Sequence, residues 1–328
     1  MKEKEIKQLF DSFNKMKVVI VGDAMIDAYM WGKIERKSPE SPVPLVEVHK
    51  HENRLGGAGN VASNIKSLGA IPILCTVVGK DYQGNNLKQL LVEEGLSTVG
   101  VFTDQTRKTT VKTRVISEQK HQIRIDEENT NPIIFEKEFL KVVFSQIHDV
   151  DIIILQDYNK GVLTPFVIKS IIEKANQTNI PTIVDPKNKN FLAYKNCSIF
   201  KPNLSEIKLG CNIDFDENEI SEIKKATLDL QQLLNAKGIL LTLSKKGVCI
   251  QTYDYFKYTN ALKRKIIDVS GAGDTVISIA ALCLAAKTDF ISLSQFANLA
   301  GGLVCEKVGV VPIDRTLLLA SAIAYFND

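Results

Sequence analysis

The sequence predicts an α/β fold with a mostly parallel central sheet. Short, nearly continuous runs of β-branched and aliphatic residues recur along the chain, with stretches of helical spacing between them. Such runs suit strands that are buried on both faces, and alternating strands and helices are typical of a parallel sheet covered by helices. The runs that we interpret as strands are residues 17–22, 73–79, 152–156, 181–185, 197–203 and 239–243.

The intervening stretches carry helix signals. In residues 60–68 the apolar side chains share one face, and Gly69 follows as a residue suited to a helix C-terminus. Thr164 and Pro165 form an N-cap and first-turn pair for a helix toward residue 175. A stripe at positions 220, 223, 227, 230 and 234 predicts a further helix.

Two segments interrupt this rhythm, residues 27–52 and 107–126. Both contain alternating patterns that predict half-exposed antiparallel strands. We expect them to form a small sheet that projects as a lid over a site, with an ordinary surface ribbon as the alternative. Because no Ser/Gly/Pro-rich linker divides the chain, we expect one domain over residues 1–328 with the two lid segments inserted.

Composition excludes several classes of protein. Of the 328 residues, 45% are hydrophobic and 24% are charged, which is enough for a core and excludes a disordered chain. The net charge of +3, from 41 basic and 38 acidic residues, argues against a broad nucleic-acid face. The longest apolar run, residues 276–286, is far shorter than the roughly 20 residues of a membrane span. The 6 cysteines form no C-x-x-C pair, so we expect reduced thiols, no zinc site and a cytoplasmic protein.

Polar residues follow the predicted strands where ligands bind in parallel sheets, beyond the carboxyl ends. Because several strands end in this way, we expect a site at that edge of the sheet. The residues at these ends are Asp23, Gln156, Asp157, Asp185, Lys187, Lys201, Asn203, Thr242 and Ser244.

The segment 268–275 (DVSGAGDT) carries the sharpest chemical signal. Gly271 and Gly273 open an apolar stretch that predicts a buried helix from Thr275 onward. A glycine turn at a helix start aims backbone N–H groups at an anion. Asp274 beside it suits proton abstraction from a hydroxyl that attacks a phosphoryl group; the alternative is a glycine turn capped by Asp. Walker A, protein-kinase and Rossmann patterns are absent.

These motifs resemble those of the ribokinase/PfkB carbohydrate kinases. The segment 268–275 is similar to the C-terminal signature of that family, 54–60 (RLGGAGN) to its N-terminal glycine-rich signature, and 203–206 (NLSE) to its N-x-x-E motif. The resemblance implies a ribokinase-like three-layer fold with a mostly parallel central sheet and a small β-sheet lid. It also implies an ATP-dependent sugar kinase that uses Mg²⁺, and it leaves a monovalent cation as an option.

Within this family the chain is most similar to the heptose phosphate kinases of ADP-heptose biosynthesis. The segments that carry this similarity are 22–29, 38–44, 157–161, 185–187 and 201–206. The resemblance implies phosphorylation of the anomeric C1 hydroxyl of D-glycero-D-manno-heptose 7-phosphate to the 1,7-bisphosphate, a precursor of lipopolysaccharide core or of a related heptose glycoconjugate. Gly59 departs from the alanine that is usual in these kinases. A kinase for another sugar and an inactive sugar sensor remain as alternatives.

Some relatives fuse this kinase to a nucleotidyltransferase with an H-x-G-H motif. The last histidine of this chain is His148, so we expect kinase activity only. A projecting lid with open edges also leads us to expect a homodimer that forms through the lid. The expected partners are otherwise small molecules, a sugar phosphate and ATP.

The resemblance assigns roles to single residues. In catalysis, Asp274 is the general base, the backbone of Gly271, Ala272 and Gly273 binds the transferring group, and Lys187 reaches the phosphates. The expected sugar contacts are Asp23, Asp27, Gly56, Gly57, Asn60, Asp157 and Lys160. The expected nucleotide contacts are Asn203, Glu206, Thr242, Ser244, Gly247 and Asn298. Mg²⁺ is expected near Asn203, Glu206 and Asp185, through water. Candidate cations for the substrate's own phosphate are Lys160, Lys187, Arg107, Lys108 and Arg114.

Overall fold

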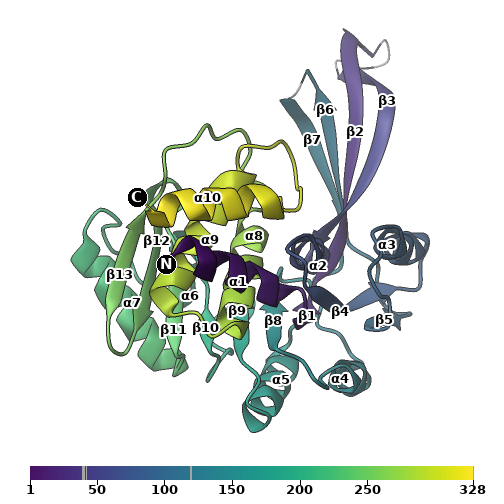
Figure 1. Cartoon of the computed structure of the whole chain (residues 1–328). Coiled ribbons are helices and arrows are strands. Elements are labelled where there is room, and N and C mark those ends of the chain that lie inside the picture. Colours follow the sequence, from purple (N-terminus) through teal and green to yellow (C-terminus); the bar gives the residue numbers. More distant parts are fainter. Residues whose placement is uncertain (39–40, 42, 119, 328) are drawn as a thin grey trace.

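The computed structural model describes residues 1–38, 41, 43–118 and 120–327. The heptose-kinase-like segment at 38–44 therefore includes three residues outside the described ones, Pro39, Glu40 and Pro42. The described chain forms two sheets and their covering helices (Figure 1).

The larger sheet confirms the predicted α/β class. In the described chain it contains 9 strands in the order β13-β12-β11-β10-β9-β8-β1-β4-β5. Every pairing from β11 to β5 is parallel, whereas β12 and β13 add an antiparallel edge. The strands are β1 (Lys17–Gly22), β4 (Ile71–Gly79), β5 (Val101–Asp104), β8 (Ile152–Gln156), β9 (Thr182–Asp185), β10 (Ile199–Phe200), β11 (Gly238–Thr242), β12 (Gly247–Thr252) and β13 (Phe256–Asn260).

Two hydrophobic clusters, one on each face of this sheet, explain the continuous apolar strands. Val18 and Ile20 of β1 belong to one cluster, and Val19 and Val21 belong to the other. The first cluster includes residues of α1 (Glu3–Phe13), α2 (Ala58–Ser67), α3 (Tyr82–Glu93), α8 (Ala272–Ala285), α9 (Phe290–Val304) and α10 (Arg315–Asn327). The second includes residues of α4 (Glu136–Ser145), α5 (Pro165–Gln177), α6 (Leu204–Cys211) and α7 (Ile220–Leu234). The result is a three-layer helix–sheet–helix body.

The smaller sheet projects from this body (Figure 1). Its strands in the described chain are β2 (Ala24–Lys37), β3 (Pro44–Gly57), β6 (Val111–Ser117) and β7 (Lys120–Glu127), in the order β3-β2-β6-β7. The prediction of antiparallel strands holds for β2 with β3 and for β6 with β7, but it is wrong for β2 with β6, which are parallel. Both hairpins leave the body on their first strand, so the two inner strands run in the same direction.

The local signals are confirmed with small shifts. Thr164 Oγ1 accepts a hydrogen bond of 3.2 Å from the Val167 N–H at the start of α5. Gly69 follows α2 with a φ of 98°. The structure starts α8 at Ala272, three residues before the predicted start. The strand predicted over 197–203 is only Ile199–Phe200, because the chain then turns into α6.

Two further observations bear on the environment of the chain. None of the helices in the described ranges has both the length and the apolar character that crossing a bilayer requires. The 6 cysteines, all among the described residues, form no disulfide, and all but Cys211 are buried.

Candidate active site

The strand ends converge as predicted, and Asp274 lies at their centre. The residue is 3% exposed, and its carboxylate accepts hydrogen bonds from three side chains. Asn60 Nδ2 donates to Oδ2 at 2.7 Å, whereas Tyr158 Oη at 2.7 Å and Gln156 Nε2 at 3.1 Å both donate to Oδ1. Burial raises the pKa of the Asp274 carboxyl to about 7, although the bonds from Asn60 and Tyr158 lower it. A carboxyl with a pKa near neutrality suits a group that takes up a proton in turnover.

The glycine turn before α8 places backbone donors beside this carboxylate. Gly271 has a φ of 78°, which favours glycine, and α8 begins at the next residue. The N–H of Ala272 donates to Val269 O at 3.2 Å, so it serves the turn itself. Among the described residues, no backbone carbonyl accepts from the N–H groups of Gly273 and Asp274. The start of α8 is therefore able to receive an anion.

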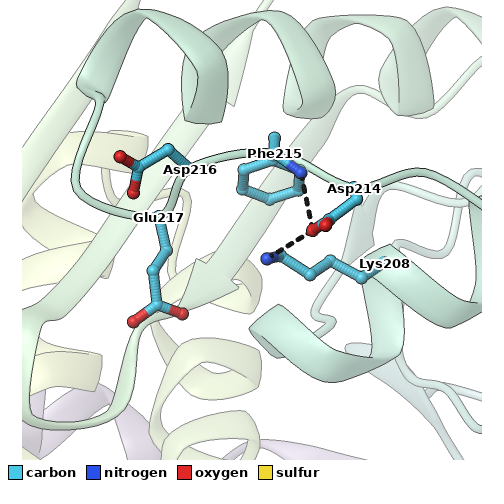
Figure 2. Close-up of a pocket in the computed structure, with 5 residues that line it drawn as sticks. All are labelled: Lys208, Asp214, Phe215, Asp216 and Glu217. Atoms are coloured by element: carbon cyan, nitrogen blue, oxygen red, sulfur yellow. Dashed lines mark hydrogen bonds and ion pairs between the residues drawn. The ribbon is translucent and has the colours of Figure 1, made fainter.

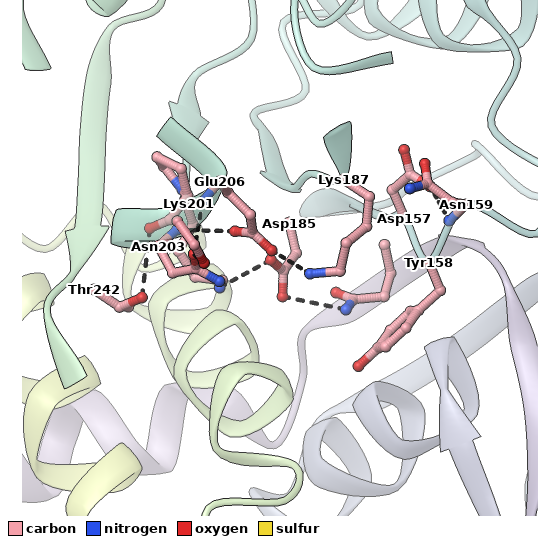
Figure 3. A network of polar contacts seen from close by, with 12 residues as sticks. Asp157, Tyr158, Asn159, Asp185, Lys187, Lys201, Asn203, Glu206 and Thr242 are labelled. Atoms are coloured by element: carbon pink, nitrogen blue, oxygen red, sulfur yellow. Dashed lines mark hydrogen bonds and ion pairs between the residues drawn. The ribbon is translucent and has the colours of Figure 1, made fainter. Parts of the chain in front are cut away.

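Asp185, the last residue of β9, is ion-paired with a lysine. Its Oδ1 is 2.9 Å from Lys201 Nζ, and its Oδ2 accepts from Gln156 Nε2 at 3.2 Å. Gln156 thus donates to Asp185 and Asp274 with the same amide nitrogen. Figure 3 shows Asp185 between Lys201 and Lys187. Lys201, Asp185 and Gln156 thus form a buried row of charged and polar side chains that ends at Asp274.

Asn203 and Glu206 form the N-terminal capping box of α6. The N–H of Glu206 donates to Asn203 Oδ1 at 2.9 Å, and the N–H of Asn203 donates to Glu206 Oε2 at 2.9 Å. The other oxygen of Glu206 is ion-paired with Lys187 (Figure 3). Burial alone lowers the pKa of Lys187, but the charges of Asp185 and Glu206 outweigh burial and raise it. The lysine therefore stays cationic at the edge of the site.

A cavity of about 590 Å³ opens beside these residues. It extends from the start of α8 to α9, between β11, β12 and the segment before α8. Of the predicted site residues, it brings together Ala272, Gly273, Asn203, Thr242, Ser244, Gly247 and Asn298. The lining also includes the apolar side chains of Leu262, Ile266 and Val269. A lining that combines hydrogen-bond donors for phosphates with apolar side chains suits a nucleotide.

Asp23 is turned toward the backbone. Its Oδ2 accepts from the N–H groups of Tyr158 at 2.8 Å and Lys160 at 3.0 Å, and its Oδ1 accepts from Val162 at 3.0 Å. Burial raises the pKa of Asp23, and these three bonds lower it. In this structure Asp23 therefore shapes the loop after β8.

Asp157 shares that loop. Its carboxylate accepts from the Tyr194 hydroxyl at 2.7 Å and from the Asn159 N–H at 2.7 Å. Burial, and then the charge of Asp23, raises the pKa of Asp157 to about 7. The negative charge of Asp23 thus favours the protonated form of Asp157.

The base of the small sheet supplies the other side of the site. Asp27 of β2 is ion-paired with Arg114 of β6. A Cβ atom at Gly56 would lie 2.6 Å from Asp27 Oδ2, and one at Gly57 would lie 3.4 Å from the Tyr158 ring. The glycines at the end of β3 therefore let the backbone approach both side chains closely.

Cations also meet between the small sheet and the body. Glu128 Oε2 is 2.6 Å from Lys160 Nζ and 3.5 Å from Lys112 Nζ, so two ammonium groups face one carboxylate oxygen. Arg107 instead donates to the backbone carbonyls of Lys160 and Asn129. Lys108 is exposed. The lysine pair is therefore better placed than Arg107 to receive an external anion.

An open hollow of about 430 Å³ lies elsewhere, on the loop between α6 and α7 (Figure 2). Its lining is Lys208, Asp214, Phe215, Asp216 and Glu217. The Lys208 ammonium pairs with Asp214 at 2.9 Å. None of the predicted site residues lies in it, so it plays no part in the site.

The residues that the sequence reasoning missed are Tyr158, Lys112 and Glu128. Tyr158 adjoins the predicted Asp157, but a tyrosine after a strand has no chemical signal of its own. Lys112 lies on β6, whose residues are buried or half-buried, and Glu128 follows β7, whose residues are all exposed, and neither position carries a chemical signal in the sequence. Only pairing of the strands brings these two together with Lys160.

The fold and the site together define a class of protein. A parallel sheet whose strand ends face a helix N-terminus, with a buried carboxylate beside it, suits transfer of a phosphoryl group to a hydroxyl. A family model described as "pfkB family carbohydrate kinase" matches residues 15–316. The chain belongs to the pfkB family of carbohydrate kinases.

The chain is similar to several known proteins. It is 34% identical over 323 residues to a bifunctional protein HldE of Geotalea uraniireducens, which covers 98% of this chain and 66% of the relative. It is 37% identical over 295 residues to the HldE of Helicobacter pylori, with coverages of 89% and 63%. The chain thus spans about two thirds of the length of these relatives.

Solved structures show the same fold. Phosphofructokinase-2 from Escherichia coli in complex with potassium superposes with a TM-score of 0.79 at 18% identity, covering 95% of this chain and 99% of that one. A ribokinase from Arabidopsis thaliana complexed with ribose and ATP gives a TM-score of 0.73 at 18% identity, with coverages of 94% and 99%. The predicted ribokinase-like fold with a small separate sheet is confirmed.

Proposed function

We propose that this kinase uses ATP to phosphorylate the anomeric C1 hydroxyl of D-glycero-D-manno-heptose 7-phosphate, in ADP-heptose biosynthesis. The observation that carries the phosphoryl-transfer step is the position of Asp274, a buried carboxyl with a pKa of about 7 in the first turn of α8. The choice of a heptose phosphate is supported by the similarity to HldE proteins and by the segments at 22–29, 157–161 and 201–206.

Asp274 acts as the general base in this proposal. It accepts the proton of the C1 hydroxyl while that oxygen forms a bond to the γ-phosphorus, and the bond from the γ-phosphorus to the bridging oxygen breaks, so that ADP leaves. The backbone of Gly271, Ala272 and Gly273 surrounds the transferring group, and Gly273, whose N–H has no backbone acceptor among the described residues, lines the cavity. Such donors stabilise the charge that spreads over the phosphoryl oxygens.

ATP occupies the cavity beside α8. Thr242, Ser244, Gly247 and Asn298 border it, and Asn203 lies at its rim. Lys187 is close enough to Glu206 to be held ready for the phosphates. When a phosphate replaces Glu206 as the partner of Lys187, the new ion pair offsets the loss of the old one.

Asp185, Asn203 and Glu206 fit Mg²⁺ only through water. Asp185 and Glu206 are each ion-paired with a lysine. No group of three or more acidic, histidine or cysteine side chains in the described residues suits a metal cage. A hydrated ion carried by the ATP phosphates matches this donor set. Bound there, Mg²⁺ supplies positive charge to the phosphates.

The sugar lies between the strand ends and the small sheet, which acts as a lid. Asp27, Gly56, Gly57 and Asn60 line that side, and Asp23 and Asp157 hold the loop that closes it. The Lys112–Lys160 pair offers two cations for the 7-phosphate, which would displace Glu128. With a neutral sugar, Glu128 stays paired with both lysines, so the two cations are used by a substrate only when it carries a phosphate.

A panel of sugars with ATP, read by ADP release, tests this function. We expect turnover with the heptose 7-phosphate and at least tenfold less with the unphosphorylated heptose. Efficient turnover of ribose or fructose 6-phosphate, with none of the heptose phosphate, would favour a kinase for another sugar. Binding of sugar without any ADP release would favour the inactive sensor.

We also propose a homodimer through the small sheet. Strand β7 is an edge strand with all of its residues exposed, and Ile123 and Ile125, which lie on one face of it, are 57% and 48% exposed. Unpaired edges with apolar side chains invite a second copy. Light scattering should give a dimer mass for the wild-type protein and a monomer mass for Ile123→Glu. A monomeric wild-type protein at micromolar concentration would contradict this pairing.

A further inference from the structure

Tyr158 connects three parts of the site. Its backbone N–H donates to Asp23 Oδ2 at 2.8 Å, and its hydroxyl donates to Asp274 Oδ1 at 2.7 Å. The Lys187 ammonium lies 5.6 Å from the centroid of its ring. Figure 3 shows the ring of Tyr158 directed from the loop after β8 toward the row of charged residues. None of the roles proposed above uses this side chain.

The contacts of Asp274 are uneven between its two oxygens. A carboxylate oxygen accepts two hydrogen bonds through its lone pairs. Oδ1 receives one from Tyr158 and one from Gln156, whereas Oδ2 receives one from Asn60. Oδ1 is therefore saturated, and Oδ2 keeps one acceptor direction for another donor.

We propose that Tyr158 is a positioning residue that saturates Oδ1 of Asp274 and so directs the proton of the acceptor hydroxyl to Oδ2. This inference rests on the proposed role of Asp274 as the base. It makes the side chain of Asn60 the nearest neighbour of the arriving proton, because Asn60 already donates to Oδ2. Tyr158 itself gives up no proton in this role.

The charged groups around Asp274 set its pKa, and loss of the Tyr158 hydroxyl changes that pKa. Charged and titratable groups face Asp274 from several elements: Tyr158 after β8, Asp185 at the end of β9, Lys201 after β10 and Lys187 after Asp185, while α2 contributes the neutral amide of Asn60. Asp185 raises the pKa of Asp274, and Lys201 lowers it, against a larger increase from burial. The hydrogen bond from Tyr158 stabilises the carboxylate, so removing it raises that pKa further.

The test is the titration of Asp274 by ¹³C NMR of carboxyl carbons, assigned with Asp274→Asn. It needs no sugar, so it stands even if the heptose phosphate is the wrong substrate. In Tyr158→Phe we expect the pKa of Asp274 to rise by about one unit, because a hydrogen bond to a charged group is worth at least one pKa unit. With the sugar that the panel identifies, the acidic limb of kcat should move up by the same amount while the KM for ATP is kept.

Tyr194→Phe is the matched control. It deletes the same hydrogen bond of 2.7 Å from a tyrosine to a buried carboxylate, here Asp157, and should leave the titration of Asp274 in place. An unchanged titration of Asp274 in Tyr158→Phe would overturn the proposal. If that variant fails to fold, the wild-type protein still decides: the ¹³Cζ resonance of Tyr158 should shift with the midpoint of Asp274, and a resonance that ignores that midpoint contradicts the contact.

Discussion

Asn60 and Asp274 are 214 residues apart in sequence, and the side-chain amide of Asn60 donates a hydrogen bond of 2.7 Å to Oδ2 of Asp274. Asn60 belongs to the glycine-rich segment at the start of α2, and Asp274 belongs to the first turn of α8. A second contact joins the same two helices: Asn64 Oδ1, one turn further along α2, accepts a hydrogen bond of 3.1 Å from Thr275 Oγ1. The two sequence signatures therefore meet in one hydrogen-bonded unit.

Asn60→Ala tests the value of this contact. The variant loses a donor to a buried carboxylate, and a hydrogen bond to a charged group contributes roughly 1.5–3 kcal/mol. We expect kcat at pH 7 to fall roughly 10- to 100-fold, because the pKa of Asp274 rises and its orientation is lost. Steady-state kinetics measures this. The control is Asn85→Ala, at an exposed position on α3, and equal kcat in both variants would contradict the prediction.

Asp274→Asn tests the general base. Proton transfer by a positioned side chain contributes roughly 100- to 10,000-fold, so kcat should fall by at least the lower of these factors. ATP binding, measured by calorimetry, should persist because Asp274 lies outside the lining of the nucleotide cavity. Asp229→Asn, at an exposed position on α7, should match the wild-type protein. Retained turnover in Asp274→Asn would remove the assignment.

Lys160→Ala tests the lysine pair at the small sheet. Loss of one charged contact to a phosphate should raise the KM for the sugar 7-phosphate roughly 10-fold or more. The KM for the unphosphorylated sugar should stay the same, because no phosphate then needs the cation. Lys169→Ala on α5, whose side chain is 72% exposed, is the control. A rise of both KM values would place Lys160 in a role other than phosphate binding.

Gly161→Ala tests the loop that Asp23 holds. Gly161 has a φ of 89°, and a Cβ atom there would lie 1.9 Å from Asn131 O. Gly95→Ala is matched, since its φ is 61° but its Cβ would meet only the flexible end of Lys66. We expect a loss of about 1 kcal/mol in the free energy of unfolding for Gly95→Ala and about 3 kcal/mol for Gly161→Ala. Equal losses in denaturant titrations would show that the loop moves freely.

The pH dependence of stability tests the raised pKa of Asp157. This carboxyl has a pKa of about 7 in the folded protein, above its ordinary value of 3.8, because of burial. The folded state therefore binds the proton more tightly, and the stability from this group is lost as the pH rises from about 4 to about 7. In Asp157→Asn that loss should be absent. Denaturant unfolding at pH 5, 6, 7 and 8 should show a shallower decline for the variant, and parallel curves would contradict the raised pKa.

Much of the site was predictable because its signals are local. The apolar run at 152–156 predicts a strand, and the two glycines before an apolar stretch predict the turn at Gly271. The base was predicted from chemistry, because a carboxylate beside an anion site is unusual. The capping pair of Asn203 and Glu206 was recognised as a motif, but its ion pair with Lys187 depends on a different strand end.

The remaining features depend on distance in three dimensions. The parallel pairing of β2 with β6 joins two segments whose patterns are the same for either direction. Asp23 was expected to face the sugar, and the structure directs its carboxylate to three backbone N–H groups of the loop after β8. No pattern in the sequence distinguishes these two uses of a carboxylate at a strand end.

By itself the sequence determined the α/β class, the glycine turn before α8 and the chemical identity of the groups at the strand ends, because each of these depends on residues that are close together in the sequence. Only the tertiary structure decided which of those groups meet. Burial of Asp274 between α2, α8 and the loop after β8 raises its pKa to about 7 and surrounds it with Asn60, Gln156 and Tyr158. Desolvation and hydrogen bonding arise from packing of distant segments, and a linear pattern does not contain them.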